Sequence, residues 1–464
     1  LYPEALFSAS FQLSFIAVGA LVFVVPRLPF PRAGDGHQRG WPRRLRLLCQ
    51  FIAVSLVLSL FTAPAVLYHF HRVSPVGTVA NIVVVPLVSF LILPAGLAAL
   101  CILPVSTNLA GFLLTLGSLG LDLVVKVATW LGGLSWACLW PGIPRAWEVA
   151  LAYVLLLLPF LRVSSWWRGG LILAGSLLLV VSWTLPAGFG SKQSFLRVTY
   201  LDVGQGNSAV VEFPQKAVML IDGGGFQGSS FDVGRHLVAP YLWHRRIRSL
   251  DVMALSHAHA DHFLGLRFVA AHFPVKEFWY NKVSTDDPHF LELIDCLARK
   301  NVAFLGPEHL ASGRRIQGVD VKVLHPPAGS GPVAAVPTHT ELNNLSLVLW
   351  LRYKHIGFLF PGDIEREAER RLTSLPGLKP VQVLLVPHHG SRTSSSMAFL
   401  QRLKPKIAVF SLGFANPFHL PASRVRKRYR NLGVRTCRTD RHGAITIRTD
   451  GHDIQVETFL PAKQ

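Results

Sequence analysis

Long apolar runs, interrupted only by short polar stretches, dominate the first 187 residues of the chain. A helix that crosses a bilayer needs about 20 mostly apolar residues, because the hydrocarbon core is about 30 Å thick and each residue rises about 1.5 Å. Runs of suitable length and composition lie at residues 7–26, 48–68, 76–103, 109–130, 147–162 and 170–187. The pattern therefore predicts a multi-span α-helical membrane domain over residues 1–187.

Two of these runs carry residues that are unusual in a membrane. The third contains Pro86 and Pro94. Helices interrupted by proline tend to line cavities, because the freed backbone groups need polar partners, although a simple kinked structural helix is the alternative. The fourth contains Asp122 and Lys126, four residues apart. They fit either an interfacial amphipathic helix with a surface pair or the polar lining of a path across the membrane.

After about residue 195 the apolar runs become short and alternate with turns. Strands are expected near residues 196–203, 208–213, 217–221, 252–255, 345–351, 357–360 and 383–386. Helices are expected near residues 263–272, 288–300, 365–373 and 396–403. Strands with interspersed helices are typical of an α/β sandwich. We therefore expect a second domain over residues 188–464.

The distribution of charge agrees with this division. Residues 1–187 carry 11 Lys and Arg and 4 Asp and Glu, whereas residues 188–464 carry 35 and 22. So abrupt a change in composition is typical of a boundary between a membrane domain and a soluble one. The net charge of +20 is shared by both parts, at +7 and +13.

The cysteines exclude two classes of site. Three of the five lie in apolar segments. The five are far apart and none forms a CxxC pair: Cys49, Cys101, Cys138, Cys296 and Cys437. A lone cysteine in an apolar segment is usually a small buried side chain. We expect neither a disulfide framework nor a zinc site built from cysteines.

Positive charge after the first apolar run suggests an orientation. The residues are Arg27, Arg32, Arg39, Arg43, Arg44 and Arg46. Such loops stay in the cytoplasm. Five further spans then place the C-terminal domain outside the cytoplasm, and the parity reverses if the fourth run does not span.

The strongest chemical signal is the segment Ser256-His257-Ala258-His259-Ala260-Asp261-His262, directly after an expected strand. This HxHxDH pattern places three imidazoles and one carboxylate within six residues, more titratable groups than a buried core needs. A turn could divide them between two metal ions, with His257 and His259 on one and Asp261 and His262 on the other. Such nitrogen and oxygen ligands suit Zn²⁺, Mn²⁺ or Fe²⁺.

Three further motifs follow expected strands. They are Asp222-Gly223-Gly224, Phe360-Pro361-Gly362-Asp363 and Val386-Pro387-His388-His389-Gly390-Ser391. The glycines of the first allow a close approach of the backbone to the site. Taken alone, each could be an ordinary turn, so their interpretation depends on their order along the chain.

Together these motifs resemble the ComEC-type bacterial DNA-uptake proteins. The membrane part resembles about the second half of the family's competence domain at Ser10–Phe15, Ala63–Phe70 and Asn81–Pro86. The soluble part resembles its metallo-β-lactamase domain through the four motifs, Leu201–Gly206, Asn343–Val348, and Thr439-Asp440 with Gly443. The family's N-terminal helices and small β-domain have no counterpart, so we interpret the chain as the C-terminal part of a longer protein.

The resemblance implies a fold, a cofactor and roles for residues. The fold is a membrane domain followed by a metallo-β-lactamase αββα sandwich, and the cofactor is two divalent metal ions, Zn²⁺ or Mn²⁺. The implied metal ligands are His257, His259, Asp261, His262, Asp363 and His388, with Asp363 bridging the ions. The implied catalytic residues are Asp261, Asp363, His389 and Asn343. Asp202, Asp222 and Asp440 are expected to orient the metal ligands by hydrogen bonds without binding the metal themselves.

The chain also departs from the family pattern. Asn207 replaces the usual Asp after VGQG, Leu264 replaces a usual Gly, and His419 lies one place early in its motif. An Asn cannot supply the negative charge of an Asp. The remaining ligand position is left open among His419, Asp440 and His442.

A basic run near the C-terminus suggests a substrate. Arg424, Arg426, Lys427 and Arg428 lie shortly after Asn416. They could form a solvated helix face or a surface that binds DNA phosphates without sequence preference. The nearness of Asn416 and Asp440 in the sequence favours DNA binding. The expected DNA contacts are Asn416, Arg424, Arg426, Lys427 and Arg428.

These features predict a multi-pass protein of the bacterial cytoplasmic membrane with an extracytoplasmic hydrolase domain. By resemblance, the hydrolase is a nuclease that degrades one DNA strand while the other crosses the membrane, and membrane lipid and other competence proteins are partners. Two alternatives stay open: a non-catalytic domain that binds and guides DNA, and a membrane-anchored metallo-esterase.

Overall fold

Apolar helices form the first of two compact units, Leu1–Leu185 and Pro186–Gln464, in a computed structural model. The structure describes residues 3–28, 43–134, 136–184, 194–283, 285–329 and 338–461. Arg32, Arg39 and the boundary expected at residue 187 lie outside these ranges. Within the described residues, the helices long and apolar enough to cross a membrane are Ala9–Arg27, Leu45–Phe70, Pro75–Ile102, Thr107–Gly132 and Ser165–Thr184.

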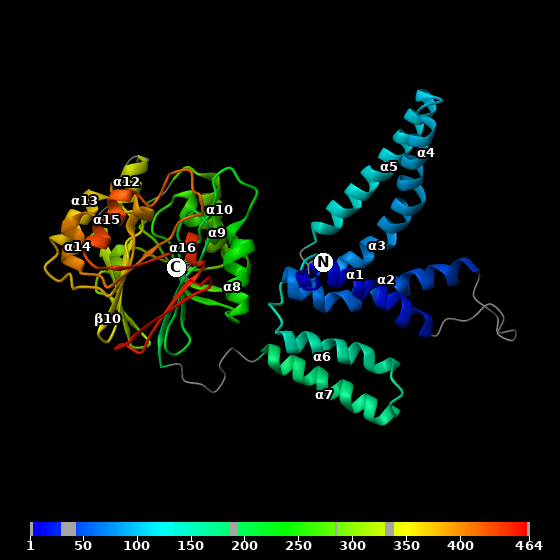
Figure 1. Ribbon diagram of the computed structural model, residues 1–464, viewed down its shortest axis with the longest axis horizontal. Coiled ribbons are helices and arrows are strands. Elements are labelled where there is room, and N and C mark those ends of the chain that lie inside the picture. Colours follow the sequence, from blue (N-terminus) through cyan, green and yellow to red (C-terminus); the bar gives the residue numbers. More distant parts are fainter. Residues whose placement is uncertain are drawn as a thin grey trace. The chain divides into compact units, whose positions relative to one another are not determined.

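The expected span at residues 147–162 is shorter than the sequence predicted. The helix α6 (Ala146–Leu157) continues as one 3₁₀ turn, Leu158–Phe160, and ends there. The apolar helix Ala146–Phe160 is about 22 Å long at about 1.5 Å per residue, less than the thickness of the hydrocarbon core. It ends early because Pro159 enters the tight last turn and Leu161 is already extended. It packs against α7 (Ser165–Thr184), as Figure 1 shows.

The proline-containing run is helical but irregular. It consists of α3 (Pro75–Leu87), a π-helical turn over Val88–Ile92, and α4 (Leu93–Ile102). Pro86 and Pro94 flank that turn, where the missing N–H groups break the regular hydrogen-bond ladder. The run packs against α5 (Thr107–Gly132), where a Cβ on Gly120 would lie only 2.9 Å from Ile92. Asp122 and Lys126 of α5 are exposed, and neither has an ion-pair partner in the described part of the chain.

The remaining membrane helices are α1 (Ala9–Gly19) and α2 (Arg43–Phe70), which pack against each other. After α1, the chain continues as a π-helical segment, Ala20–Val24, and a short 3₁₀ turn. Gln12 and His69 join the two helices by a side-chain hydrogen bond of 2.8 Å.

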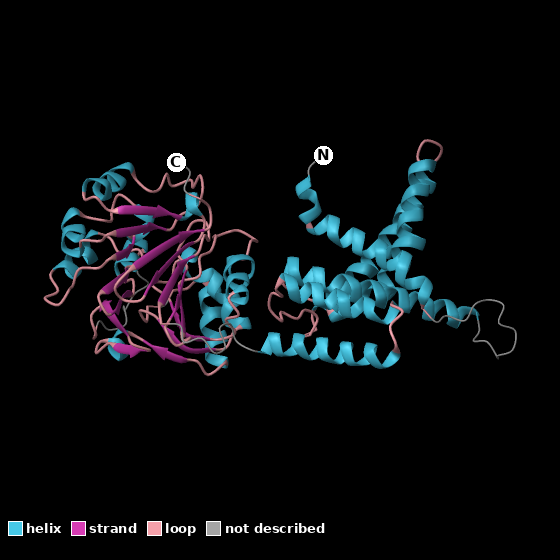
Figure 2. Cartoon of the chain, turned by 60° about the horizontal axis from the view of Figure 1, so that its bottom comes forward, coloured by secondary structure: helices cyan, strands magenta, loops and turns pink. Residues whose placement is uncertain are grey.

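The second unit contains two mixed β-sheets. The first has the order β15 (Ile454–Thr458), β14 (Ile445–Thr449), β1 (Leu196–Tyr200), β2 (Ala209–Glu212), β3 (Val218–Ile221), β4 (Leu250–Ala254), β5 (Val275–Trp279) and β6 (Ala303–Leu305). The second has the order β13 (Arg435–Arg438), β12 (Ile407–Phe410), β11 (Val383–Leu385), β10 (Ile356–Phe360), β9 (Val348–Tyr353), β8 (Val319–His325) and β7 (Arg314–Ile316). Figure 2 shows the two layers of strands.

Helices cover the outer faces of both sheets, which confirms the αββα sandwich. One apolar core contains residues of both sheets, and Tyr200 stacks on Phe360 across it at 5.9 Å between ring centroids. The outer helices are α8 (Ala239–His244), α9 (Ala260–His272), α10 (Pro288–Arg299), α13 (Arg366–Thr373), α14 (Met397–Leu403) and α15 (Ser423–Asn431). The shorter α11 (Pro307–Leu310), α12 (His339–Asn344) and α16 (Thr439–His442) lie in connections.

The strand directions explain where the motifs gather. In each sheet, one half is antiparallel and the other contains parallel pairs, β3 to β6 in the first and β10 to β13 in the second. Asp222 follows β3, His257 follows β4, Asp363 follows β10 and His389 follows β11. Sites in α/β folds form at the carboxyl ends of parallel strands. The motifs therefore come together although they are far apart in the sequence.

Close backbone contacts at α9 predict a strong effect of a small substitution. A Cβ on Gly265 would lie 2.1 Å from the carbonyl oxygen of Gly223, whereas a Cβ on Gly377 meets nothing within 4 Å. The atom that the new Cβ would meet belongs to the backbone and cannot move aside as a flexible side chain would. We therefore expect Gly265→Ala to lower the thermal unfolding midpoint of the full chain by about 6 °C or more. Gly377→Ala is the control and should change it by less than about 2 °C. Equal midpoints for both variants would contradict this packing.

Candidate metal centre

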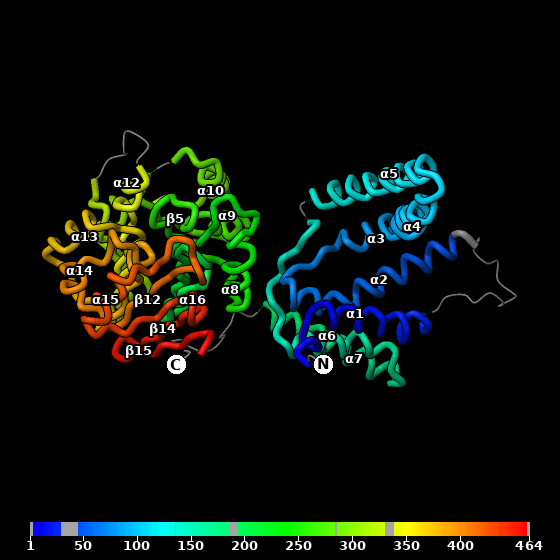
Figure 3. Tube along the Cα trace, turned by 45° about the horizontal axis from the view of Figure 1, so that its top comes forward, coloured from blue at the N-terminus to red at the C-terminus, as the bar shows by residue number. Residues whose placement is uncertain are grey.

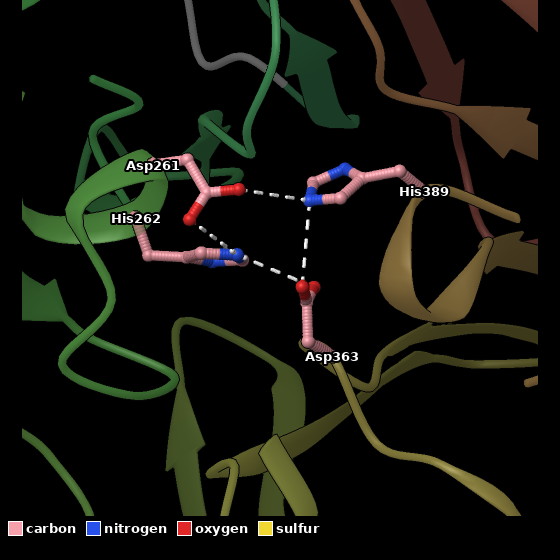
Figure 4. A group of neighbouring side chains, drawn as sticks. All are labelled: Asp261, His262, Asp363 and His389. Carbon is pink, nitrogen blue, oxygen red and sulfur yellow. Dashed lines mark ion pairs between the residues drawn. The ribbon is translucent and has the colours of Figure 1, made fainter. Parts of the chain in front are cut away.

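Four side chains from three separate loops converge at the edge of the sandwich. Asp261 and His262 open α9, Asp363 follows β10, and His389 follows β11 (Figure 4). Each offers one nitrogen or oxygen atom, and these atoms all lie within 4.8 Å of one another. His262, Asp363 and His389 are buried, and Asp261 is partly exposed.

The distances show a compact ring of alternating imidazoles and carboxylates. The Nε2 atom of His262 lies 3.2 Å from Oδ1 of Asp363, and that of His389 lies 3.4 Å from Oδ2 of Asp363. The Nε2 atom of His389 is also 3.3 Å from Oδ2 of Asp261. Asp363 thus contacts both imidazoles, as Figure 4 shows.

The inner atoms of this ring lie 3.2 to 3.4 Å from one another but form no hydrogen bond of acceptable geometry. Nε2 of His262, Nε2 of His389 and Oδ1 of Asp363 are all buried without one. Buried polar atoms are nearly always satisfied, and each exception needs an explanation such as an ion. Imidazole and carboxylate ligands suit Zn²⁺ or Mn²⁺. The residues present therefore fit a divalent metal ion.

The outer nitrogens of the two imidazoles are held by the protein. Nδ1 of His262 donates to Oδ2 of Asp222 at 2.9 Å, and Nδ1 of His389 donates to the carbonyl oxygen of Ser411 at 2.8 Å. Asp222 also accepts from the backbone N–H and the hydroxyl of Ser256 at 2.7 and 2.9 Å. Such contacts fix the ring orientation and leave Nε2 free to bind a cation, as is usual for metal-binding histidines.

The carboxylates and imidazoles shift one another's pKa values. Burial would raise the pKa of Asp363, but His389 and His262 hold it well below its ordinary value. Burial would lower the pKa of His389, but Asp363 and Asp261 raise it to about 10. The same carboxylates, with Asp222, raise the pKa of His262 well above its ordinary value despite burial. Without a metal, the negative charge of the ring is thus balanced by protonated imidazoles.

His257 and His259 form a neighbouring pair. Nε2 of His257 lies 2.8 Å from Nδ1 of His259, and the His257 ring lies 4.2 Å from that of His262. Burial and His262 lower the pKa of His257, and burial and His339 lower that of His259 to about 4. Both imidazoles are therefore neutral, which is the form that binds metals.

Comparison with known proteins places this geometry in a family context. Residues 1–166 match the family model "Competence protein", and residues 201–413 match "Metallo-beta-lactamase superfamily". The chain joins a competence-protein domain to a metallo-β-lactamase superfamily domain. This confirms the ComEC-type organisation predicted from the sequence.

Curated relatives extend over both domains. ComE operon protein 3 of Bacillus subtilis is 28% identical over 460 residues, 96% of this chain and 56% of the relative. Competence protein ComA of Neisseria gonorrhoeae is 27% identical, over 96% of this chain and 56% of the relative. The chain thus spans about half the length of the curated relatives it matches. The diiron β-hydroxylase CmlA of Streptomyces venezuelae is a solved structure with 13% identity and a TM-score of 0.37 over 60% of each chain. So low a similarity does not contribute to the fold assignment.

Within this metallo-β-lactamase domain, the two consecutive histidines differ from the expectation. The sequence resemblance favoured His388 as the ligand, whereas the structure brings His389 into the group of four. Nδ1 of His388 lies 3.4 Å from Glu365, and its Nε2 lies 3.8 Å from Asp363. Both residues have positive φ angles, 47° and 53°, so the chain turns sharply here and separates the two rings. Sequence order alone could not choose between them.

Other expected site residues have partners outside the group of four. Asn343 is buried and donates to Glu365 at 3.3 Å. Asp202 accepts from the backbone N–H of Gly204 at 3.4 Å. Asp440 is paired with Arg438. Of these three expected site residues, none belongs to the group of four.

The open ligand position has one candidate left near the centre. His419 lines the pocket above the metal centre, whereas Nδ1 of His442 lies 2.9 Å from the backbone nitrogen of Arg438. That pocket has a volume of about 900 Å³. Asp261, Asp363, His388 and His389 also line it.

The expected DNA contacts divide into two groups. Arg424, Arg426 and Lys427 are exposed on α15. Arg428 instead donates to the carbonyl oxygens of Ser394 and Ser395 at 3.0 and 2.7 Å. Asn416 is likewise occupied with the backbone of its own loop. These two residues therefore hold loops in place.

His339 is among the residues of the site that the sequence analysis did not identify. His339, at the start of α12, stacks on His259 with 3.8 Å between ring centroids and lines the pocket. It belongs to no motif, and no spacing linked it to His259. Only its position after the Thr338 helix cap could have suggested a fixed orientation.

Proposed function

We propose that this chain is part of a membrane protein of bacterial DNA uptake and that its metallo-β-lactamase domain is a metal-dependent phosphodiesterase that cleaves DNA. The supporting observation is the ring of Asp261, His262, Asp363 and His389, whose inward-facing atoms are buried without hydrogen-bond partners. The Competence protein match over residues 1–166 connects this centre with uptake of DNA.

The residues divide the work in this proposal. Asp261, His262, Asp363 and His389 would hold one divalent ion. The neutral pair His257 and His259 would extend the site toward a second. Bound divalent ions activate water and neutralise charge on the phosphoryl oxygens. His388 and Arg392, which line the same pocket, position the phosphate, and Glu365 fixes the ring of His388.

The orientation in the membrane depends on α6. An arginine-rich loop stays in the cytoplasm. If α6 and α7 cross as a hairpin, the hydrolase domain lies outside the cytoplasm, where it can meet incoming DNA. The packing of α6 against α7 supports a hairpin, in which the short α6 would cross where the bilayer is locally thinned.

Asn207 supports a second candidate function. It is buried beside the centre, its backbone N–H donates to the carbonyl oxygen of Asp261 at 3.2 Å, and neither atom of its amide has a partner. A neutral amide in place of the family's Asp fits a domain that binds and guides DNA without cleaving it.

Cleavage of labelled DNA by the full chain in detergent distinguishes these functions. We expect cleavage with Mn²⁺ or Zn²⁺, loss of cleavage with a chelator, recovery when metal is restored, and loss in His257→Ala. Binding without cleavage under all metal conditions would support the guiding domain. If the chain neither binds nor cleaves DNA, both functions are contradicted, and an esterase with another anionic substrate is favoured.

A further inference from the structure

Two phenylalanines are exposed on a single loop at the mouth of the metal pocket. The segment between β12 and α15 can be followed in Figure 3. It contains Phe414 and Phe418, with 84% and 65% of their surface exposed. Phe418 also lines the pocket that contains Asp363 and His389. Single exposed apolar residues are common, but two on one short loop beside an active centre indicate a binding surface.

The loop that carries them is held in a fixed shape. The amide of Asn416 donates to the carbonyl oxygens of Gly413 and Leu420 at 3.1 and 2.8 Å and accepts from the backbone N–H of Leu420 at 2.9 Å. At its base, a Cβ on Gly413 would lie 3.0 Å from the backbone nitrogen of Gln205. Because the loop is fixed at both ends, its rings are presented without a large entropic cost on binding.

Positive charge lies beside the rings. Arg392 is exposed and lines the same pocket, and its guanidinium forms no ion pair within the residues that the structure describes. The exposed Arg424 and Arg426 follow the loop on α15. A ligand that fits both features has flat apolar groups linked by negative charges.

We propose that the loop of residues 413–420 binds an unpaired stretch of DNA by stacking bases on Phe418 and Phe414, while Arg392 binds a phosphate on the way to the metal centre. Aromatic platforms beside basic grooves are typical of single-strand binding. In a duplex the base faces are already stacked on each other, so these rings gain nothing from paired DNA. The inference deepens the proposed function, because it names the substrate form that the centre receives.

Binding of a fluorescent 15-nucleotide oligo-dT to the full chain in detergent, with a chelator present to prevent cleavage, tests the inference. We expect each of Phe418→Ala and Phe414→Ala to weaken binding by about 5-fold to 150-fold, since stacking on one ring contributes that much affinity. Phe418→Trp should restore it. Binding of a blunt duplex of the same length should change less than about 2-fold in every variant.

Phe459→Ala is the matched control, because Phe459 is 81% exposed and does not line the pocket. It should bind oligo-dT like the parent chain. Unchanged oligo-dT binding in both loop variants, or an equal loss of duplex binding, would overturn the inference. If the loop variants lose binding to anionic lipid vesicles but keep binding to oligo-dT, the inference is also overturned and the loop is assigned to the membrane surface.

Failure of this inference and failure of the proposed function give different results. Hydrolysis of bis(4-nitrophenyl) phosphate by the parent chain requires the metal centre, so this reaction tests the proposed function separately from the binding of oligo-dT. If the parent chain hydrolyses neither this ester nor DNA but loses oligo-dT binding in Phe418→Ala, the nuclease proposal fails and the inference stands. If the parent chain cleaves DNA and Phe418→Ala binds oligo-dT normally, the inference alone fails.

Discussion

Asp363→Ala is expected to reduce DNA cleavage by at least about 10³-fold, because it removes the carboxylate that contacts both inner imidazoles. Asp363 lies 3.2 Å from His262 and 3.4 Å from His389, and its side chain is only 4% exposed. Without it, a metal ion loses a ligand and the two histidines lose the charge that compensates them. The measurement is the initial rate of cleavage of labelled DNA at saturating Mn²⁺.

A neighbouring carboxylate provides the control for this variant. Glu367 is exposed on α13 and pairs with Arg371 four residues later, away from the centre. Glu367→Gln should keep the cleavage rate within about 2-fold, since an exposed ion pair contributes little. If Asp363→Ala folded normally and kept a tenth of the activity, Asp363 would not be a ligand at the reacting metal.

Asp222→Ala is expected to weaken both the fold and the metal centre. Asp222 is buried and accepts three hydrogen bonds, two from Ser256 and one from His262. Its loss leaves buried donors unsatisfied, so we expect a decrease in unfolding free energy on the order of 3 kcal/mol. Metal affinity should fall about 10-fold to 100-fold because the His262 ring is no longer oriented.

Thermal unfolding and calorimetric titration with Zn²⁺ measure these two effects. Asp450→Ala is the control: Asp450 accepts from the backbone N–H groups of His452 and Asp453 in an exposed turn. Water can replace those bonds, so the control should cost less than about 1 kcal/mol and leave metal affinity unchanged. An Asp222→Ala protein with unchanged metal affinity would contradict the supporting role.

The sequence predicted the parts of the centre that lie within short motifs. Asp261 and His262 are adjacent, and their pattern after a strand indicated a metal site before any geometry was known. Asp363 depended on the order of motifs along the chain. The parallel strands bring the loops that follow them to one edge of the fold. Motifs that are far apart along the chain therefore lie close together in space.

Features that depend on side-chain direction could not be predicted. His388 and His389 are equivalent in the sequence, and only the turn at two positive φ angles distinguishes them. Arg428 belongs to a basic run but faces the backbone of another loop. The length of α6 was overestimated because apolar composition continues through Pro159, where the helix tightens and ends.

The metal content of the purified full chain tests the central claim most directly. Elemental analysis after removal of free ions should find about one to two divalent ions per chain, and a chelated sample should take up Zn²⁺ or Mn²⁺ again. The same measurement on Asp363→Ala should find less. A folded parent chain that contains no metal and binds neither ion would contradict the account.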